Sequence, residues 1–582
     1  MKNYKKVYAA FILAGGLILH GCNGIFDDLA INPNQPSMGA YFTSPSAVND
    51  AVMTMYGYMS TQRCLGASGS KTTIIRSDEA SSNSDYGKPG MFGADLNASY
   101  YTIEQPYTLM YTTASQASYI IETAPSVDFS GNEELRNAYM GEAYFWRAFA
   151  HYYLLINFRN ISPIRQMPRN GDDYVRPLEK PAAVWNFIQE DLAHAKELLP
   201  VKGYWDSKNA GRVTKASAAA LLGKAYLYRS GIEQYYGEDK TTFYSEAAKE
   251  FGDVIDGKYG TYDLTKNYAD NFDVAHENNE ESILEFQFLG DVDNAGFNPG
   301  LATSGLAFDS RGLMLPGAGV GYEGVVHNWL YNAFVNSVDK DGYTDIRMFS
   351  TMIFNDLDAS IHLRNDAGGN PVRLEGPGGY KWEELYPAKN GKEGFATVSN
   401  PLAHSFKAGI RKGIDCSMPT QTEADGTPKL VGVGAGVKEY VYNQPRAHGV
   451  NWRYIRYADV LMMYAESVVS GGTPASNMIP LQAVNKVRGR ANMSELPSVT
   501  MTDIQNERIL EFALEGHRFY DLLRWGKLAS RFTELQESDP NFKKFISADD
   551  FKGFVTNKHE WLPIPINEVN SNPYITENNP GY

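Results

Sequence analysis

Acidic and basic side chains alternate within residues 504–527, a stretch that also carries a helical apolar face. The charged residues are Glu507, Arg508, Glu511, Glu515, Arg518, Asp521 and Arg524. One interpretation is a catalytic acid held by an arginine clamp. The other is a set of ion pairs that locks a helix into a bundle, because charges embedded in an apolar face need partners. No pocket chemistry accompanies the alternation, which favours the ion-pair lock. The spacings 515–518, 518–521 and 521–524 are i,i+3, so these residues can be neighbours on a helix.

Motifs that could bind a nucleotide or a metal ion are incomplete. Residues 319–324 fit the pattern G-x-G-x-x-G, but no strand pattern precedes them, which favours a flexible loop. Residues 339–345 are similar to a calcium-binding loop but lack its third early ligand and its distal Glu, which favours a turn. The sequence contains neither H-E-x-x-H nor G-x-S-x-G. We therefore predict no metal site, no cofactor and no catalytic residue.

Aromatic and polar residues gather in three loops rather than on helix faces. An aromatic ring can stack on the C–H face of a sugar, while Asn, Asp or Arg side chains bond its hydroxyls. The candidate ligand-binding residues are Arg76, Asp78, Asn83, Asp85, Tyr86, Tyr100 and Tyr101 in the first loop, Asp291, Asn294, Tyr322 and Trp329 in the second, and Trp382 in the third. Any single aromatic among them is more often a packing residue than a stacking one.

Composition and charge exclude some functions. The chain has 582 residues, 43% of them hydrophobic, with 38 tyrosines and a formal charge of −15. A chain this acidic lacks the basic footprint that nucleic-acid binding needs. Besides Cys22 it has only Cys64 and Cys416, which could form one bridge or remain buried thiols, but cannot form a disulfide framework or a metal cluster.

The N-terminus is typical of a secreted lipoprotein. Three lysines at positions 2, 5 and 6 precede a short apolar run, 7–19, and Gly21 precedes Cys22 as in a lipoprotein cleavage box. We predict a signal peptide over 1–21, lipidation of Cys22 and a tether over 22–43. The apolar run is shorter than the ~20 residues that a transmembrane helix needs. The protein would therefore be held at a membrane by its lipid.

Helical spacing of apolar residues runs through most of the chain. It predicts helices over 44–59, 107–124, 133–158, 181–199, 213–229, 242–256, 328–336, 453–469, 476–490 and 504–527. Consecutive helices form pairs, which predicts an all-α, tetratricopeptide-like helix-pair solenoid. Residues 60–105 and 258–450 carry few periodic runs and are predicted to be long, loop-rich insertions.

Several motifs together resemble the SusD/RagB family of outer-membrane lipoproteins. They span nearly the whole mature chain in the family's order. The matching segments are 32–34, 142–148, 212–218, 456–466, 484–491, 507–508, 515–526, 562–565 and 572–573. The two long loops carry no segment that matches.

The resemblance implies a SusD-like N-terminal helical-repeat region over 44–257. It implies a SusD/RagB C-terminal region over 258–582, with the loop-rich insertion and the closing helices, in one compact unit with the first. It also implies a surface-exposed protein without enzymatic activity. Its partner would be a SusC-like TonB-dependent transporter, and its cargo a nutrient glycan or, as in some members, a peptide. The residues alone also leave open a surface glycoside hydrolase or a purely structural helical-repeat adaptor.

Overall fold

A computed structural model of the chain describes most of the sequence beyond the tether. The described residues are 42–61, 63–65, 70–82, 92, 96–288, 308–309, 324–376, 379–398, 401–412, 430–432, 438–440, 447–448, 450–539, 542 and 553–582. Predicted site residues outside these ranges are Cys22, Asn83, Asp85, Tyr86, Asp291, Asn294 and Tyr322. Cys416 and most of the 319–324 motif also lie outside them.

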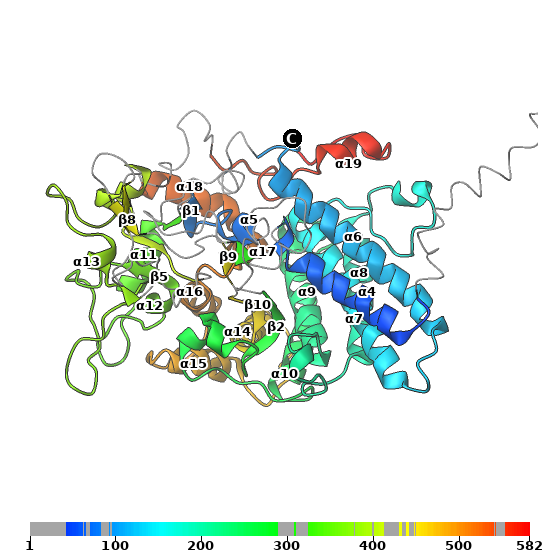
Figure 1. Ribbon diagram of the computed structural model, residues 1–582, viewed down its shortest axis with the longest axis horizontal. Coiled ribbons are helices and arrows are strands. Elements are labelled where there is room, and N and C mark those ends of the chain that lie inside the picture. The colour runs from blue at the N-terminus through cyan, green and yellow to red at the C-terminus, as the bar shows by residue number, and fades with distance from the viewer. Residues whose placement is uncertain are drawn as a thin grey trace, which may run out of the picture.

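Six helices of the first half pack side by side (Figure 1). They are α4 (Pro45–Met59), α6 (Tyr101–Thr123), α7 (Glu133–Phe158), α8 (Pro181–Leu198), α9 (Lys215–Tyr236) and α10 (Tyr244–Ile255). Each of α6 to α10 packs on the next, and α4 packs on α6 and α7. This succession is the helix-pair arrangement that the sequence predicts.

Local signals set where these helices begin. The Ser44 hydroxyl accepts a hydrogen bond from the Ala47 amide at the start of α4. Asn132 caps α7 in the same way, by accepting from the Leu135 amide. Pro181 occupies the first turn of α8, where its missing N–H leaves no partner unsatisfied. The helices predicted over 44–59, 133–158 and 181–199 are confirmed to within one residue at each end.

The closing part of the chain continues the frame. It contains strand β10 (Trp452–Arg456) and helices α14 (Tyr457–Val469), α15 (Pro480–Arg490), α16 (Met501–Glu511), α17 (Arg518–Arg524) and α18 (Leu528–Ser538). Helix α14 packs on α10, and α17 packs on α9, so the two halves share one interface (Figure 1). Within the described residues, no helix is both long and apolar enough to cross a membrane.

Three predictions for the closing part are wrong in detail. The helix predicted over 476–490 begins only at Pro480, where the proline occupies the first turn of α15. Residues 453–456 are not helical, because they pair antiparallel with β2 (Ser282–Phe286) as part of β10. Residues 504–527 do not form one helix, because the chain turns between α16 and α17. Gly516 in that turn has φ +83°, a left-handed conformation that favours glycine.

The predicted loop regions contain a small sheet and several short helices. Strands β1 (Ala80–Ser82), β4 (Gly324–Val326), β6 (Ala408–Ile410) and β5 (Met352–Phe354) form an antiparallel sheet in that order. Other elements of these regions are α5 (Ser70–Ile74), β3 (Phe308–Asp309), α11 (Asn328–Val335), α12 (Met348–Thr351), α13 (Trp382–Leu385), β7 (Leu430–Gly432), β8 (Lys438–Tyr440) and β9 (Ala447–His448). Most of this part of the chain lies on the side of the molecule opposite α4 to α8 (Figure 1). Outside these regions, α19 (Ile566–Ser571) lies close to the C-terminus.

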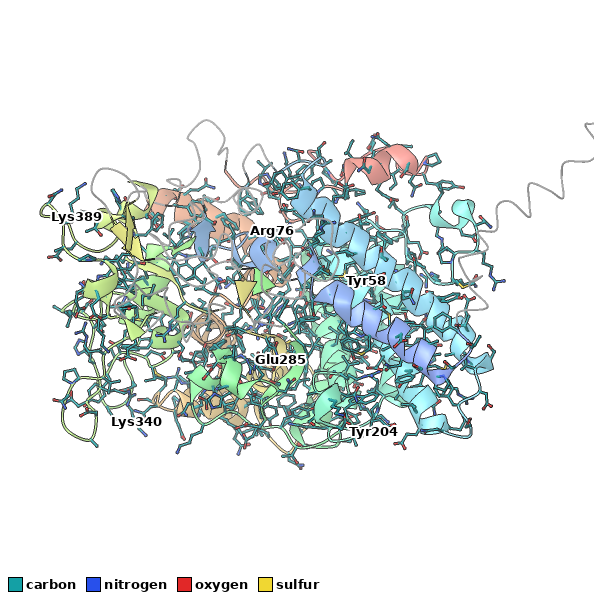
Figure 2. The ribbon with its side chains drawn as sticks, viewed as in Figure 1. Tyr58, Arg76, Tyr204, Glu285, Lys340 and Lys389 are labelled. Atoms are coloured by element: carbon teal, nitrogen blue, oxygen red, sulfur yellow. The ribbon has the colours of Figure 1, made fainter. Side chains whose placement is uncertain are left out.

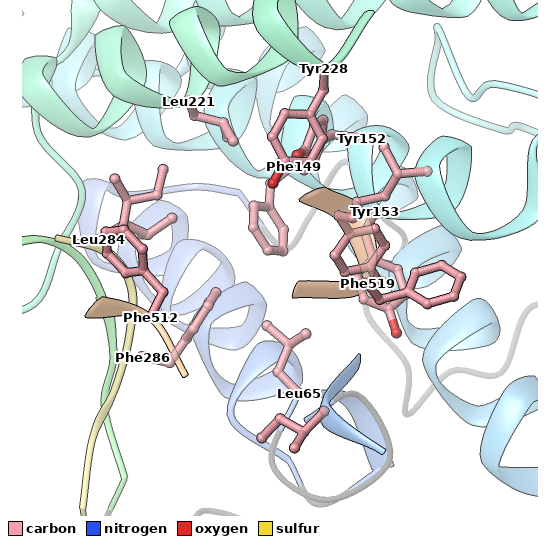
Figure 3. Close-up of a cluster of buried hydrophobic side chains, with 14 of the residues drawn as sticks. Leu65, Phe149, Tyr152, Tyr153, Leu221, Tyr228, Leu284, Phe286, Phe512 and Phe519 are labelled. Carbon is pink, nitrogen blue, oxygen red and sulfur yellow. The ribbon is translucent and has the colours of Figure 1, made fainter. Parts of the chain in front are cut away.

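One hydrophobic core joins the early helices to the closing ones. Figure 3 shows Phe149 and Tyr153 of α7 in one cluster with Phe286 of β2 and Phe519 of α17. All four side chains are buried. Phe149 lies 5.7 Å from Phe286, centroid to centroid, at 63° between the rings. Edge-to-face pairs of this kind stabilise a core beyond their buried area. The early and late segments therefore share one hydrophobic core.

Candidate functional site

The charged residues of 504–527 form a buried ion-pair network with residues far away in sequence. Arg456 donates to Glu281 at 2.7 Å, to Glu511 at 2.6 Å and to Glu515 at 2.9 Å. Arg347 donates to Glu511 at 3.0 Å. All five side chains are at most 5% exposed. The ion-pair lock is confirmed.

A second part of the network surrounds Asp521 on α17. Arg508 donates to Asp521 at 2.8 Å and to Asp459 at 2.8 Å. Lys224 of α9 also donates to Asp459, at 3.1 Å. Burial raises the pKa of Asp459, but Lys224 and Arg508 outweigh it and hold that pKa well below its usual range. The network therefore ties α9, α14, α16 and α17 together.

The turn at Gly516 changes which charges meet. Of the three i,i+3 pairs that the sequence allows, Asp521–Arg524 forms, at 2.9 Å. Glu515 bonds Arg456 and Lys412 instead, and Arg518 bonds Asp78. An acid that is saturated by buried arginines has neither the free proton nor the access to solvent that general acid catalysis needs. The arrangement gives no support to an acid–arginine active site on this helix pair.

Arg76 and Asp78 have structural roles, contrary to their prediction as ligand contacts. Arg76 is 1% exposed and donates to the carbonyls of His559 and Glu560 at 3.1 and 2.9 Å. Figure 2 shows Arg76 near the middle of the molecule. Asp78 is fully buried and accepts from Arg518 at 2.9 Å and from Arg531 at 2.6 Å. Sequence reasoning missed this because the partners lie more than 400 residues away.

Trp329 and Trp382 are also held by the fold. The Trp329 indole N–H donates to the Asp78 carbonyl, and the Arg531 guanidinium lies 4.2 Å from the Trp329 ring centroid. Trp382 is 6% exposed and packs on Tyr386 and Phe395, with centroids 4.6 and 5.0 Å away. These contacts account for both rings as packing residues.

Tyr100 and Tyr101 lie at the start of α6, next to the C-terminal segment. Their ring centroids are 5.1 Å apart, and Tyr101 is 38% exposed. The Ile566 amide donates to the Ala98 carbonyl at 2.8 Å, which fixes α19 beside them. Tyr101 therefore offers an aromatic surface to solvent from a rigid position.

The first and second predicted binding loops each contain one strand of the same pair. Strand β1 lies within the first loop, and strand β4 lies within the second. Ser82 and Gly324 are register partners in the antiparallel sheet. No local pattern indicates this pairing, because 241 residues lie between the two positions. Ligand contacts by the residues of these loops stay a prediction.

The calcium-like segment is a turn whose carboxylates have protein partners. Asp339 accepts from the amides of Asp341 and Tyr343 at 2.8 and 3.0 Å. It also pairs with Arg364. Among the described residues, no group of three or more His, Cys, Asp or Glu could hold a metal ion. Cys64 is a buried free thiol, and burial raises its pKa.

Sequence reasoning also missed a groove of about 650 Å³ between α9, α10, α14, α16 and α17. Its lining residues come from separate helices and form no local motif.

A helical-repeat frame, closed by ion-paired helices and carrying a loop-rich second half, defines the class of this protein. Two families match the sequence. Residues 422–582 match the family described as the SusD family. Residues 31–227 match the family described as "Starch-binding associating with outer membrane".

Known proteins agree with this assignment. A SusD-like protein of Bacteroides ovatus is 25% identical over 533 residues, which cover 90% of this chain and 83% of the relative. A SusD superfamily protein of Bacteroides vulgatus has a similar crystal structure, with a TM-score of 0.67 and 22% identity over 93% of this chain and all of that one. Surface glycan-binding protein A of Bacteroides thetaiotaomicron, solved with laminarihexaose, gives a TM-score of 0.62 and 17% identity over 92% of this chain and all of that one. The chain belongs to the SusD-like family.

Proposed function

We propose that this protein is a lipid-anchored, surface-exposed lipoprotein of the outer membrane that binds a nutrient glycan, an oligosaccharide or polysaccharide. It delivers the glycan to a SusC-like TonB-dependent transporter and is not an enzyme. The observation that carries the proposal is the match of residues 31–227 to the family described as starch-binding and associated with the outer membrane. The B. thetaiotaomicron protein with the same fold, solved with laminarihexaose, also supports it.

The arrangement of the described residues fits a binding role. The charges of α16 and α17 that could serve catalysis are taken up by the frame. Exposed Tyr101 and the paired strand ends at Ser82 and Gly324 bring candidate binding segments onto a rigid support. A glycan is bound by many weak contacts, and a support that is already ordered reduces the entropy lost on binding.

Calorimetry on the mature protein tests the cargo. A panel of neutral oligosaccharides, including laminarihexaose and maltohexaose, should give saturable binding and no release of reducing ends. If peptides bind and no glycan binds, the cargo is a peptide and not a glycan. Release of reducing ends that is lost on changing one carboxylate would make the protein a glycoside hydrolase.

Membrane fractionation tests the anchor and the partner. Cys22→Ala should release the protein from the outer membrane, whereas Cys64→Ala, a change at a buried thiol, should not. Wild-type protein extracted in mild detergent should co-purify with a large β-barrel transporter. Retention of the Cys22→Ala protein in the membrane would contradict the anchor.

A further inference from the structure

The groove between α9, α10, α14, α16 and α17 lies outside the predicted binding loops. None of its lining residues belongs to 60–105 or 258–450. Its volume of about 650 Å³ falls within the range of about 300–1,000 Å³ that is usual for small-molecule sites. It is therefore a separate candidate for binding.

A buried carboxylate with a free oxygen lines this groove. Glu466 of α14 is 2% exposed. One of its oxygens, Oε1, accepts from the Trp525 indole N–H at 2.9 Å and pairs with Arg524. The other oxygen, Oε2, has no hydrogen-bond partner among the described residues. A buried acceptor without a donor is costly, so a ligand hydroxyl that donates to Oε2 would be favoured.

A tyrosine at the edge of the groove is exposed yet supported from below. Tyr235, near the end of α9, is 52% exposed. Its ring lies so close to Gly526 that a Cβ added there would be 2.5 Å from the ring. Gly526 also has φ +64°, so both its conformation and this close approach require glycine. The ring is thus backed by main chain and presents apolar surface to solvent.

Polar and charged groups complete the lining. Lys527 donates to the Gln505 side-chain oxygen at 2.7 Å, and both residues lie at the surface. The lining holds two cationic residues, Arg524 and Lys527, and two acids, Glu246 and Glu466. The formal charge of the groove is therefore zero, which disfavours polyanions and leaves a neutral, hydroxyl-rich ligand as the best match.

We propose that this groove is a second saccharide site, which takes a short neutral oligosaccharide. The Tyr235 ring stacks on the apolar face of one sugar, and a hydroxyl donates to Glu466 Oε2. The amide of Gln505 bonds hydroxyls at the rim. The inference rests on the proposed glycan-binding function and adds a site to it. Two sites on one rigid body would hold a long glycan more firmly than either alone, because the second contact is intramolecular.

Calorimetry with laminarihexaose, maltohexaose, cellohexaose, xylohexaose and mannohexaose tests the site. We compare wild type, Tyr235→Ala, Tyr235→Phe and the control Tyr574→Ala. Tyr574 is 59% exposed and does not line the groove, so it matches Tyr235 in accessibility. Both residues are exposed, so neither alanine variant should unfold. Tyr235→Ala should lower the affinity for at least one sugar by tenfold or more, or remove one of two sites. Tyr235→Phe and Tyr574→Ala should bind like wild type.

The outcomes separate this site from the proposed function. If every sugar that binds wild type binds Tyr235→Ala equally well and at the same number of sites, the groove site is refuted and glycan binding stands. If no sugar binds wild type, both proposals are refuted. A crystal structure of wild type soaked with the bound sugar should show it against Tyr235 and Glu466. A sugar seen only on other surfaces would also refute the groove site.

Discussion

Asp521 at the centre of the buried network gives the sharpest test of the ion-pair lock. Its carboxylate is 2% exposed and accepts from Arg508 at 2.8 and 3.1 Å and from Arg524 at 2.9 Å. Asp521→Ala leaves two buried guanidinium groups short of an acceptor. Removing one partner of a buried pair destabilises a protein by about 3–5 kcal/mol. Arg508 keeps Asp459 and Arg524 keeps Glu466, so we expect the lower end of this range.

Thermal unfolding measures this effect. An unfolding entropy of about 2.1 cal/mol/K per residue gives about 1.2 kcal/mol/K for a chain of this length. The variant should therefore melt about 3 °C below wild type. Glu238→Ala is the control, because Glu238 pairs with Lys180 with 90% of its side chain exposed, and it should melt like wild type.

Glycan binding by the Asp521→Ala variant tells whether Asp521 has a structural role or a ligand-binding role. At a temperature where Asp521→Ala is folded, calorimetry should give an affinity within twofold of wild type. An unchanged melting temperature would refute the lock. A stable variant that has lost glycan binding would show that Asp521 contributes to ligand binding rather than to the frame alone.

Three further predictions concern buried acids and the exposed aromatic surface. Burial, with the neighbouring Asp78, raises the pKa of Glu79 to about 8. The contribution of the Glu79 carboxyl to the free energy of unfolding is therefore complete below pH ~4.5 and is lost as the pH rises towards 8. Glu79→Gln should then melt up to about 4 °C above wild type at pH 8 and like wild type at pH 4. Burial raises the pKa of Glu281, but Arg490 and Arg456 outweigh it and hold that pKa at about 2, so its contribution is present above pH ~4.5 and lost as the pH falls to 2. Glu281→Gln should be less stable than wild type at pH 7, with a smaller loss on acidification, as followed by circular dichroism. Tyr101→Ala should weaken glycan binding about tenfold in calorimetry without lowering the melting temperature; equal affinity would exclude this ring from the site.

The helices could be predicted where one stretch of sequence carries its own signals. Residues 133–158 combine a cap at Asn132 with a long apolar face, and the helix appears with those bounds. Residues 453–456 looked helical because they run directly into α14. They form a strand because Glu285, Leu284 and Ser282 of β2 lie opposite, 168 or more residues away. No local window contains that pairing.

The roles of single residues were harder to predict for the same reason. Arg76 and Asp78 have the composition of a polar binding loop. Their partners, Glu560 and Arg518, are brought to them only by the fold. The groove was missed because Tyr235, Glu466 and Lys527 come from segments far apart in the sequence, and no local motif surrounds any of them. Whether a charged residue is a buried ion-pair partner or a ligand contact depends on its neighbours in the folded chain, and residue type alone does not show it.

The buried contacts of Asp78 link the closing helices to the predicted binding loops. Asp78 is joined to Arg518 and Arg531, and Ser82, four residues later, pairs with Gly324. The closing helices therefore hold β1, which lies within the first predicted binding loop, and β1 in turn pairs with β4 in the second. A support that is ordered before the ligand arrives leaves less entropy to lose on binding. Asp78 was predicted as a ligand contact, and in the structure its carboxylate joins the first predicted binding loop to the closing helices.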